Sequence, residues 1–138
     1  MRALFSGYEK QIYRCGAGKW IVGVDTNGDL YPCGPMIGLQ GCKIGSVFTG
    51  IDESAKRFYE EDLLVTRKLI CKVCWARYMC GGGCYQAAFL ANGGAHLPDP
   101  WDCELIQHLI QLAIHLVACL QQNRPAVSGA LSSKLGFE

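Results

Sequence analysis

The chain of 138 residues has the length of one ordinary domain, and half of its residues are apolar, which is enough for a modest core. It has 13 basic and 12 acidic residues, so the net charge is +1, and without a basic stripe or acidic tail the composition favours neither nucleic-acid nor membrane binding. The nine cysteines lie below the roughly 8–10% that marks a disulfide scaffold. Since the first residues show no signal-peptide pattern, we expect a cytoplasmic protein with reduced thiols.

The N-terminal part predicts a β-hairpin. Residues 1–12 carry little signal and are interpreted as a leader or the remnant of an upstream element. Residues 20–24 predict a short strand and residues 30–33 its return strand, because Asn27-Gly28 between them suits a tight turn with positive φ. Such a hairpin would bring Cys15 and Cys33 to one site. An extended piece is expected near residues 43–48.

The rest of the chain predicts helices and cysteine-rich loops. Asp52 can cap a helix that the apolar spacing extends to about residue 70. A short helix is expected over residues 85–91, and an irregular proline segment leads into Cys103. Residues 104–123 predict an amphipathic helix whose apolar run is too short to span a membrane. The predicted fold class is small α+β, with one domain over residues 13–122 and a flexible tail over residues 123–138.

Seven of the nine cysteines follow one ordered pattern, C-x12-G-x4-C, a gap, C-x2-C-x5-C-x3-C, a gap, and a final C. Thiolates are soft ligands that suit zinc or iron–sulfur clusters. Seven are more than one four-ligand site can use and one too few for two sites, so the pattern indicates two metal centres. Adding Cys42 would complete two zinc sites of four cysteines each, and a structural zinc module for protein contact therefore stays an alternative.

The pattern resembles the SPASM domain, which is the C-terminal twin-cluster extension of radical S-adenosylmethionine enzymes that modify peptides and proteins. The resemblance covers roughly residues 13–120. It includes the local text Asn27-Gly28-Asp29-Leu30-Tyr31-Pro32-Cys33, Lys43-Ile44-Gly45-Ser46-Val47 and Cys71-Lys72-Val73-Cys74-Trp75-Ala76-Arg77-Tyr78-Met79-Cys80-Gly81-Gly82-Gly83-Cys84.

The resemblance implies two [4Fe–4S] clusters around which the hairpin, loops and helices wrap. The first would be held by Cys15, Cys33 and Cys84, here called the first cysteine set, with either Cys42 or an open position as its fourth ligand. The second would be held by the second cysteine set, which is Cys71, Cys74, Cys80 and Cys103. The implied role is electron transfer and substrate binding, and the implied partners are a peptide or protein substrate and a radical S-adenosylmethionine barrel, in the same parent enzyme or on a separate chain.

Two departures narrow these expectations. The parent enzymes cleave S-adenosylmethionine with a C-x3-C-x2-C triplet, which this chain lacks, so we do not expect it to be catalytic alone. Sulfatase-maturating members have an aspartate where this chain has Gly34, which favours the maturases that crosslink cysteine-rich peptides. Outside the pattern, Cys119 is interpreted as a buried core thiol and His96 as an exposed loop residue.

Overall fold

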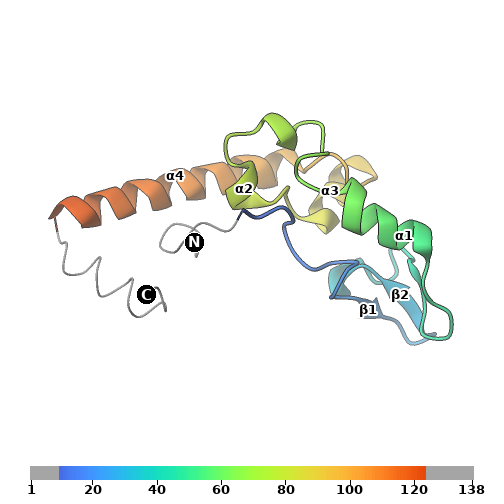
Figure 1. Cartoon of the computed structure of the whole chain (residues 1–138). Helices are drawn as coiled ribbons and strands as arrows, with labels where there is room; N and C mark the ends of the chain where they lie inside the picture. Colours follow the sequence, from blue (N-terminus) through green and yellow to red (C-terminus); the bar gives the residue numbers. More distant parts are fainter. Residues whose placement is uncertain (1–9, 124–138) are drawn as a thin grey trace.

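The computed structural model describes residues 10–123. Its class is α+β, as expected: a small antiparallel sheet lies at one end and a long C-terminal helix extends away from the other (Figure 1). The sheet has four strands in the order β1 (Gly23–Val24), β2 (Asp29–Tyr31), β3 (Gly45–Ser46) and β4 (Gly50–Ile51). Most of the predicted leader and nearly all of the predicted tail lie outside the described residues.

The predicted hairpin is confirmed as β1 and β2. Val24 pairs with Leu30, and Gly28 adopts a φ of 83°, the left-handed conformation that the turn requires. Asp25 holds the turn, because its carboxylate accepts hydrogen bonds from the N–H groups of Asn27 and Asp29, both at 2.9 Å. A second hairpin, β3 and β4, continues the sheet beside β2.

The helix expected from residue 52 to about residue 70 ends much earlier, and that prediction is wrong. It comprises α1 (Glu53–Arg57) and a π-helical turn, η3 (Phe58–Asp62), and the side chain of Asp52 makes no capping hydrogen bond. Beyond it, Leu63 and Val65 are fully buried, and the N–H of Val65 donates to the carbonyl of Ile12 at 3.0 Å. A tertiary hydrogen bond thus replaces the helical one, and the chain turns inward.

The cysteine-rich segment consists of short helical pieces joined by glycines. It contains the 3-10 turn η4 (Cys71–Val73), α2 (Arg77–Cys80) and α3 (Tyr85–Asn92). Gly81, Gly82 and Gly83 all have positive φ, at 73°, 102° and 78°, and make the sharp turn that three glycines permit. Gly93 ends α3 in the left-handed conformation, as predicted.

The last helix, α4 (Pro100–Asn123), begins four residues earlier than expected. Asp99 precedes it and accepts a hydrogen bond from the N–H of Trp101 at 3.2 Å, while Pro100 occupies the first helical position. Cys103 therefore lies in the first turn of a helix, and the prediction of an irregular segment up to it is wrong.

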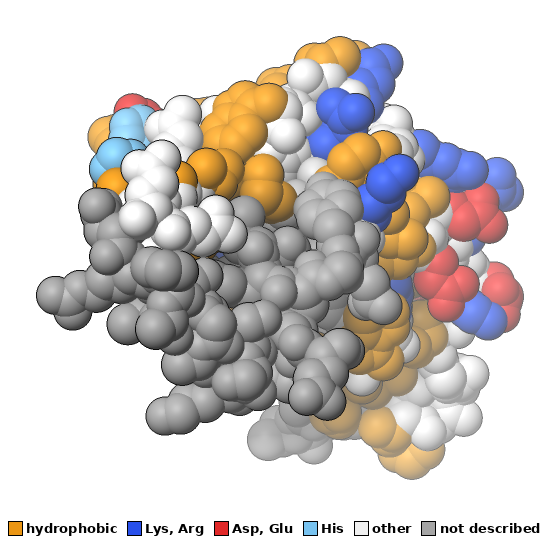
Figure 2. All heavy atoms as spheres, turned by 60° about the vertical axis from the view of Figure 1, so that its left-hand side comes forward, with side chains coloured by type: hydrophobic (Ala, Val, Ile, Leu, Met, Phe, Trp, Pro, Cys, Tyr) orange, Lys and Arg blue, Asp and Glu red, His pale blue; other side chains and the backbone are white. Residues whose placement is uncertain are grey.

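The side of α4 that faces away from the body is apolar as well as polar. Leu105, Leu109, Leu112 and Leu116 are all exposed, and Figure 2 shows apolar and histidine side chains next to each other on the visible face. Within the described residues, α4 is long and apolar enough by composition to cross a membrane, and none of the residues in its apolar window is buried. His108 and His115 would be costly in hydrocarbon, which favours the amphipathic interpretation.

The core lies between the sheet, η3 and α3. Its main cluster joins one buried side chain of β2, Leu30, to Leu63 and Tyr85. A smaller cluster contains Tyr31, Met36 and Cys42. Both clusters pack against Cys33, and the smaller one includes Cys42, so the core borders the first of the two predicted metal centres.

Candidate metal centres

All four cysteines of the second set line one cavity. Its volume is about 100 Å³, and the remaining lining is mostly apolar, with Val65, Ala76 and Ile106 among its side chains. A single water needs about 10–15 Å³ on this measure, so the cavity has room for a group of several atoms. The four cysteines come from three separate elements and one connecting segment, and they converge on one cavity.

Short helical pieces bring these four thiols together. Cys71 begins η4, Cys74 follows it directly, and Cys80 ends α2. Cys103 arrives from the first turn of α4, which packs against α2. The positive end of the α4 dipole favours a thiolate at Cys103.

The thiols of the second set influence each other electrostatically. Burial raises the pKa of Cys71, Lys68 lowers it, and Cys80 and Cys74 raise it again. Burial also raises the pKa of Cys103 to about 11, with further contributions from Cys71 and Cys80. Four adjacent thiolates would repel one another, so this set can lose its protons together only when positive charge binds among them.

Lys68 lies against this set, fully buried at 1% exposure. Its ammonium donates a hydrogen bond to the carbonyl of Gly82 at 2.7 Å. Burial lowers the pKa of Lys68, and Cys71, Cys103 and Cys80 raise it. The sequence carried no signal for this residue, because the turn that points it inward depends on contacts with the N-terminal segment.

The first set is more open. Burial raises the pKa of Cys33, a backbone hydrogen bond from Met36 lowers it, and both Cys15 and Cys84 raise it. The three cysteines that the resemblance implies for one cluster are therefore electrostatic neighbours. Cys15 is exposed, and Cys84 occupies the N-cap position of α3, where the helix dipole favours an anion.

Cys42 lies beside the first set and is buried at 4% exposure. Burial raises its pKa, and so does Cys33. Its neighbours in the core are Tyr31 and Met36. The residue is thus positioned close to one member of the first set, and its role as the fourth ligand stays a prediction.

Tyr85 lies between the two sets. Its hydroxyl is buried and has no hydrogen-bond acceptor among the described residues. Burial raises the pKa of Tyr85, and Cys15 and Tyr13 raise it further. The ammonium groups of Lys19 and Lys68 are 5.2 Å and 5.5 Å from the centre of its ring. A buried hydroxyl proton without an acceptor suits a site at which a sulfur atom would accept it.

Asp102 connects the two sets. Its carboxylate accepts a hydrogen bond from the N–H of Cys84 at 2.9 Å, while the next residue is Cys103. A displacement of α4 would therefore disturb the first set as well as the second. No sequence motif includes Asp102, because its hydrogen-bond partner Cys84 is 18 residues away in the chain.

The described residues do not bring three candidate ligands to the spacing of a single bound metal ion. Zinc–thiolate bonds of about 2.3 Å would draw the sulfurs on one ion to roughly 4 Å from each other. Within residues 10–123, no three His, Cys, Asp or Glu side chains are close enough together to hold one metal ion.

Residues outside the two sets do not extend them. His96 is exposed and packs edge-to-face on Phe58 at 5.0 Å, as predicted for a loop histidine. Cys119 is only partly buried and lies 3.5 Å from Nε2 of His115, so its interpretation as a buried core thiol is wrong. It lies on the part of α4 that extends beyond the body.

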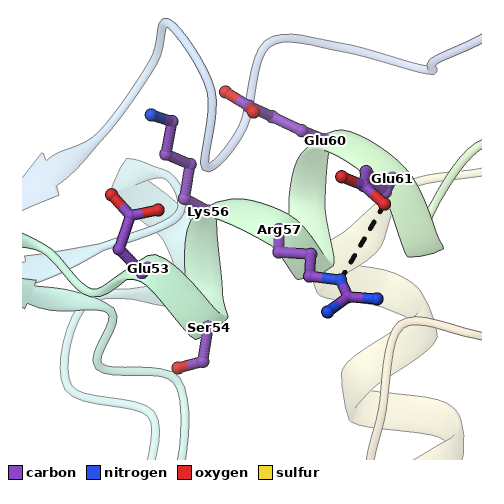
Figure 3. A pocket seen from close by; sticks show the side chains of 6 residues that line it. All are labelled: Glu53, Ser54, Lys56, Arg57, Glu60 and Glu61. Carbon is purple, nitrogen blue, oxygen red and sulfur yellow. Dashed lines mark ion pairs between the residues drawn. The ribbon is translucent and has the colours of Figure 1, made fainter.

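A hollow of about 450 Å³ follows α1 and η3 (Figure 3). It is lined by charged side chains of both signs, including an exposed ion pair of 3.8 Å between Arg57 and Glu61. It contains no cysteine or histidine. We interpret it as a solvated helix surface, and it adds no residue to the candidate metal centres.

Comparison with known proteins identified no relative of this chain. No model of a known protein family matches the chain, and a search of curated proteins found no significant match.

Proposed function

We propose that this chain is an iron–sulfur module of the SPASM type, which acts as the auxiliary, twin-cluster part of a radical S-adenosylmethionine maturase of peptides or proteins. The observation that carries the proposal is the single cavity lined by Cys71, Cys74, Cys80 and Cys103. Its size, its apolar lining and its four cysteines suit a cluster with four thiolate ligands.

The second set would hold a [4Fe–4S] cluster with protein ligands alone. The first set would hold another through three cysteines, with Cys42 or a substrate group at the fourth position. Bound clusters would supply one-electron transfer, and one with an open position would also bind a substrate thiol. The protein residues would exclude water around the second set and hold the thiols in place through α2 and α4.

The exposure of the two sets favours different roles for them. Cys15 is exposed, so a peptide could reach the first set, whereas no cysteine of the second set is exposed and Cys71 is buried. Substrate binding is therefore proposed at the first set and electron transfer at the second. Exposed apolar residues such as Phe48 and Trp101 fit contact with a partner domain. We propose that this partner is the catalytic barrel, in the same parent enzyme or on a separate chain, and that the complex is cytoplasmic.

Metal analysis of anaerobically purified protein tests the proposal. We expect about eight iron and about eight sulfide per chain, because each of two sites holds a four-iron cluster. About two zinc per chain with no iron would instead support the alternative of a structural zinc module. With reductant and S-adenosylmethionine, the isolated chain should form no 5′-deoxyadenosine above the blank, since it lacks the cysteine triplet.

A further inference from the structure

Lys68 is the one fully buried charged side chain within the described residues. Its ammonium donates to the carbonyl of Gly82 at 2.7 Å, and no carboxylate of residues 10–123 forms an ion pair with it within 4.0 Å. A buried charge without a counter-ion is strongly unfavourable. Lys68 therefore stays a cation at this position only when negative charge binds or forms nearby.

The second cysteine set lies beside Lys68, because Gly82, whose carbonyl accepts from the ammonium, lines the same cavity as these four cysteines. Burial lowers the pKa of Lys68, and Cys71, Cys103 and Cys80 raise it more than Asp102 does. The carboxylate of Asp102 is farther away than an ion pair allows and accepts a hydrogen bond from Cys84. Thiolates at these cysteines would thus supply the missing counter-charge.

The local backbone is built to admit this side chain. Gly82 has a φ of 102°, and a Cβ atom there would approach Cδ of Lys68 to 3.3 Å. A glycine at this position thus leaves room for the stem of Lys68 and offers its carbonyl to the ammonium. The face of the Tyr85 ring, 5.5 Å away, adds a weak cation–π contact.

We propose that Lys68 is the charge-compensating residue of the second cysteine set and raises the reduction potential of the cluster bound there. The inference rests on the proposed function. A cluster with four thiolates is an anion, and reduction adds one more negative charge to it. A buried cation therefore stabilises the reduced form more than the oxidised form.

The effect should be specific to the second cluster. Lys19, near the first set, is only half-buried, and its ammonium contacts the rings of Tyr13 and Trp20 at 4.2 Å and 5.3 Å. Water screens an exposed charge, so its influence on a potential is much smaller. Lys72, between Cys71 and Cys74, is exposed and provides a matched control.

The test is a redox titration of the full chain, followed by electron paramagnetic resonance. The transition that is missing from Cys80→Ala identifies the second cluster. In Lys68→Gln, its reduction should be at least tenfold less favourable, which is about 59 mV for a one-electron couple. Lys68→Arg and Lys72→Gln should stay within about threefold of the wild type, because the first keeps the buried charge and the second removes a screened one.

Two results of the titration would overturn the proposed role of Lys68. A Lys68→Gln shift no larger than that of Lys72→Gln, or an equal shift in Lys68→Arg, overturns the proposal. If Lys68→Gln fails to load the second cluster, retained iron in Lys68→Arg supports the charge role, and equal loss in both overturns it. Wild-type protein without iron–sulfur clusters would refute the proposed function before any variant is compared, and the inference would fall with it.

Discussion

At the residue scale, the division of the cysteines into two sets makes distinct predictions for single variants. Cys33→Ala should affect the first cluster and Cys80→Ala the second, so each should lose about four iron per chain. Cys119→Ala should lose none, because this residue lies on the far part of α4 beside His115. Iron and sulfide analysis checks these values. Equal iron loss for Cys33→Ala and Cys119→Ala would show that the assignment of cysteines to sites is wrong.

The glycine turn between Cys80 and Cys84 makes a second prediction at this scale. A Cβ atom at Gly81 would overlap the carbonyl of Tyr13, whereas one at Gly93 would meet nothing within 4 Å. The two glycines have nearly the same φ, 73° and 70°. Gly93→Ala should therefore cost only the left-handed backbone energy, about 1–2 kcal/mol.

Gly81→Ala should cost clearly more than Gly93→Ala, because the clash is with backbone that cannot move freely. Denaturant unfolding of the loaded protein measures both values. Equal costs would mean that the N-terminal segment around Tyr13 does not pack against this turn.

At the element scale, α4 depends on a cap that also positions Cys103. The carboxylate of Asp99 accepts a hydrogen bond from the N–H of Trp101 at 3.2 Å. Asp99→Ala should reduce the free energy of unfolding by about 1 kcal/mol, while Asp99→Ser should keep most of it because serine also caps helices. Denaturant midpoints of the three proteins test this. A loss of the same size in Asp99→Ser would contradict the capping role.

At the scale of the whole molecule, the small core predicts that metal binding supplies much of the folding free energy. The sheet strands have two or three residues each, and both buried clusters pack against Cys33 of the first set. Removing the metal by chelation should lower the melting temperature by about 10 °C or more, as the loss of a few kcal/mol does in a domain of this size. Circular dichroism melts of anaerobic protein measure it. A cooperative, equally stable melt of iron-free and zinc-free protein would refute the prediction.

The sequence alone was sufficient for features that depend on neighbouring residues. The turn at Gly28, the end of α3 at Gly93 and the long C-terminal helix follow from local chemistry, and the structure confirms them. The start of α4 at Pro100 could also have been predicted from the sequence, because Asp99-Pro100 is a typical helix-start signal. The prediction placed the start at residue 104 instead. The order and spacing of the cysteines indicated two metal centres, and that stays a prediction.

Tertiary structure decided what depends on contacts between distant segments. The hydrogen bond from Val65 to Ile12 ends a helix that periodicity extends, and the same turn buries Lys68. The hydrogen bond from Cys84 to Asp102 connects the two cysteine sets across 18 residues. No periodicity or spacing encodes these contacts, because they arise only when the chain segments pack together and bury their polar groups.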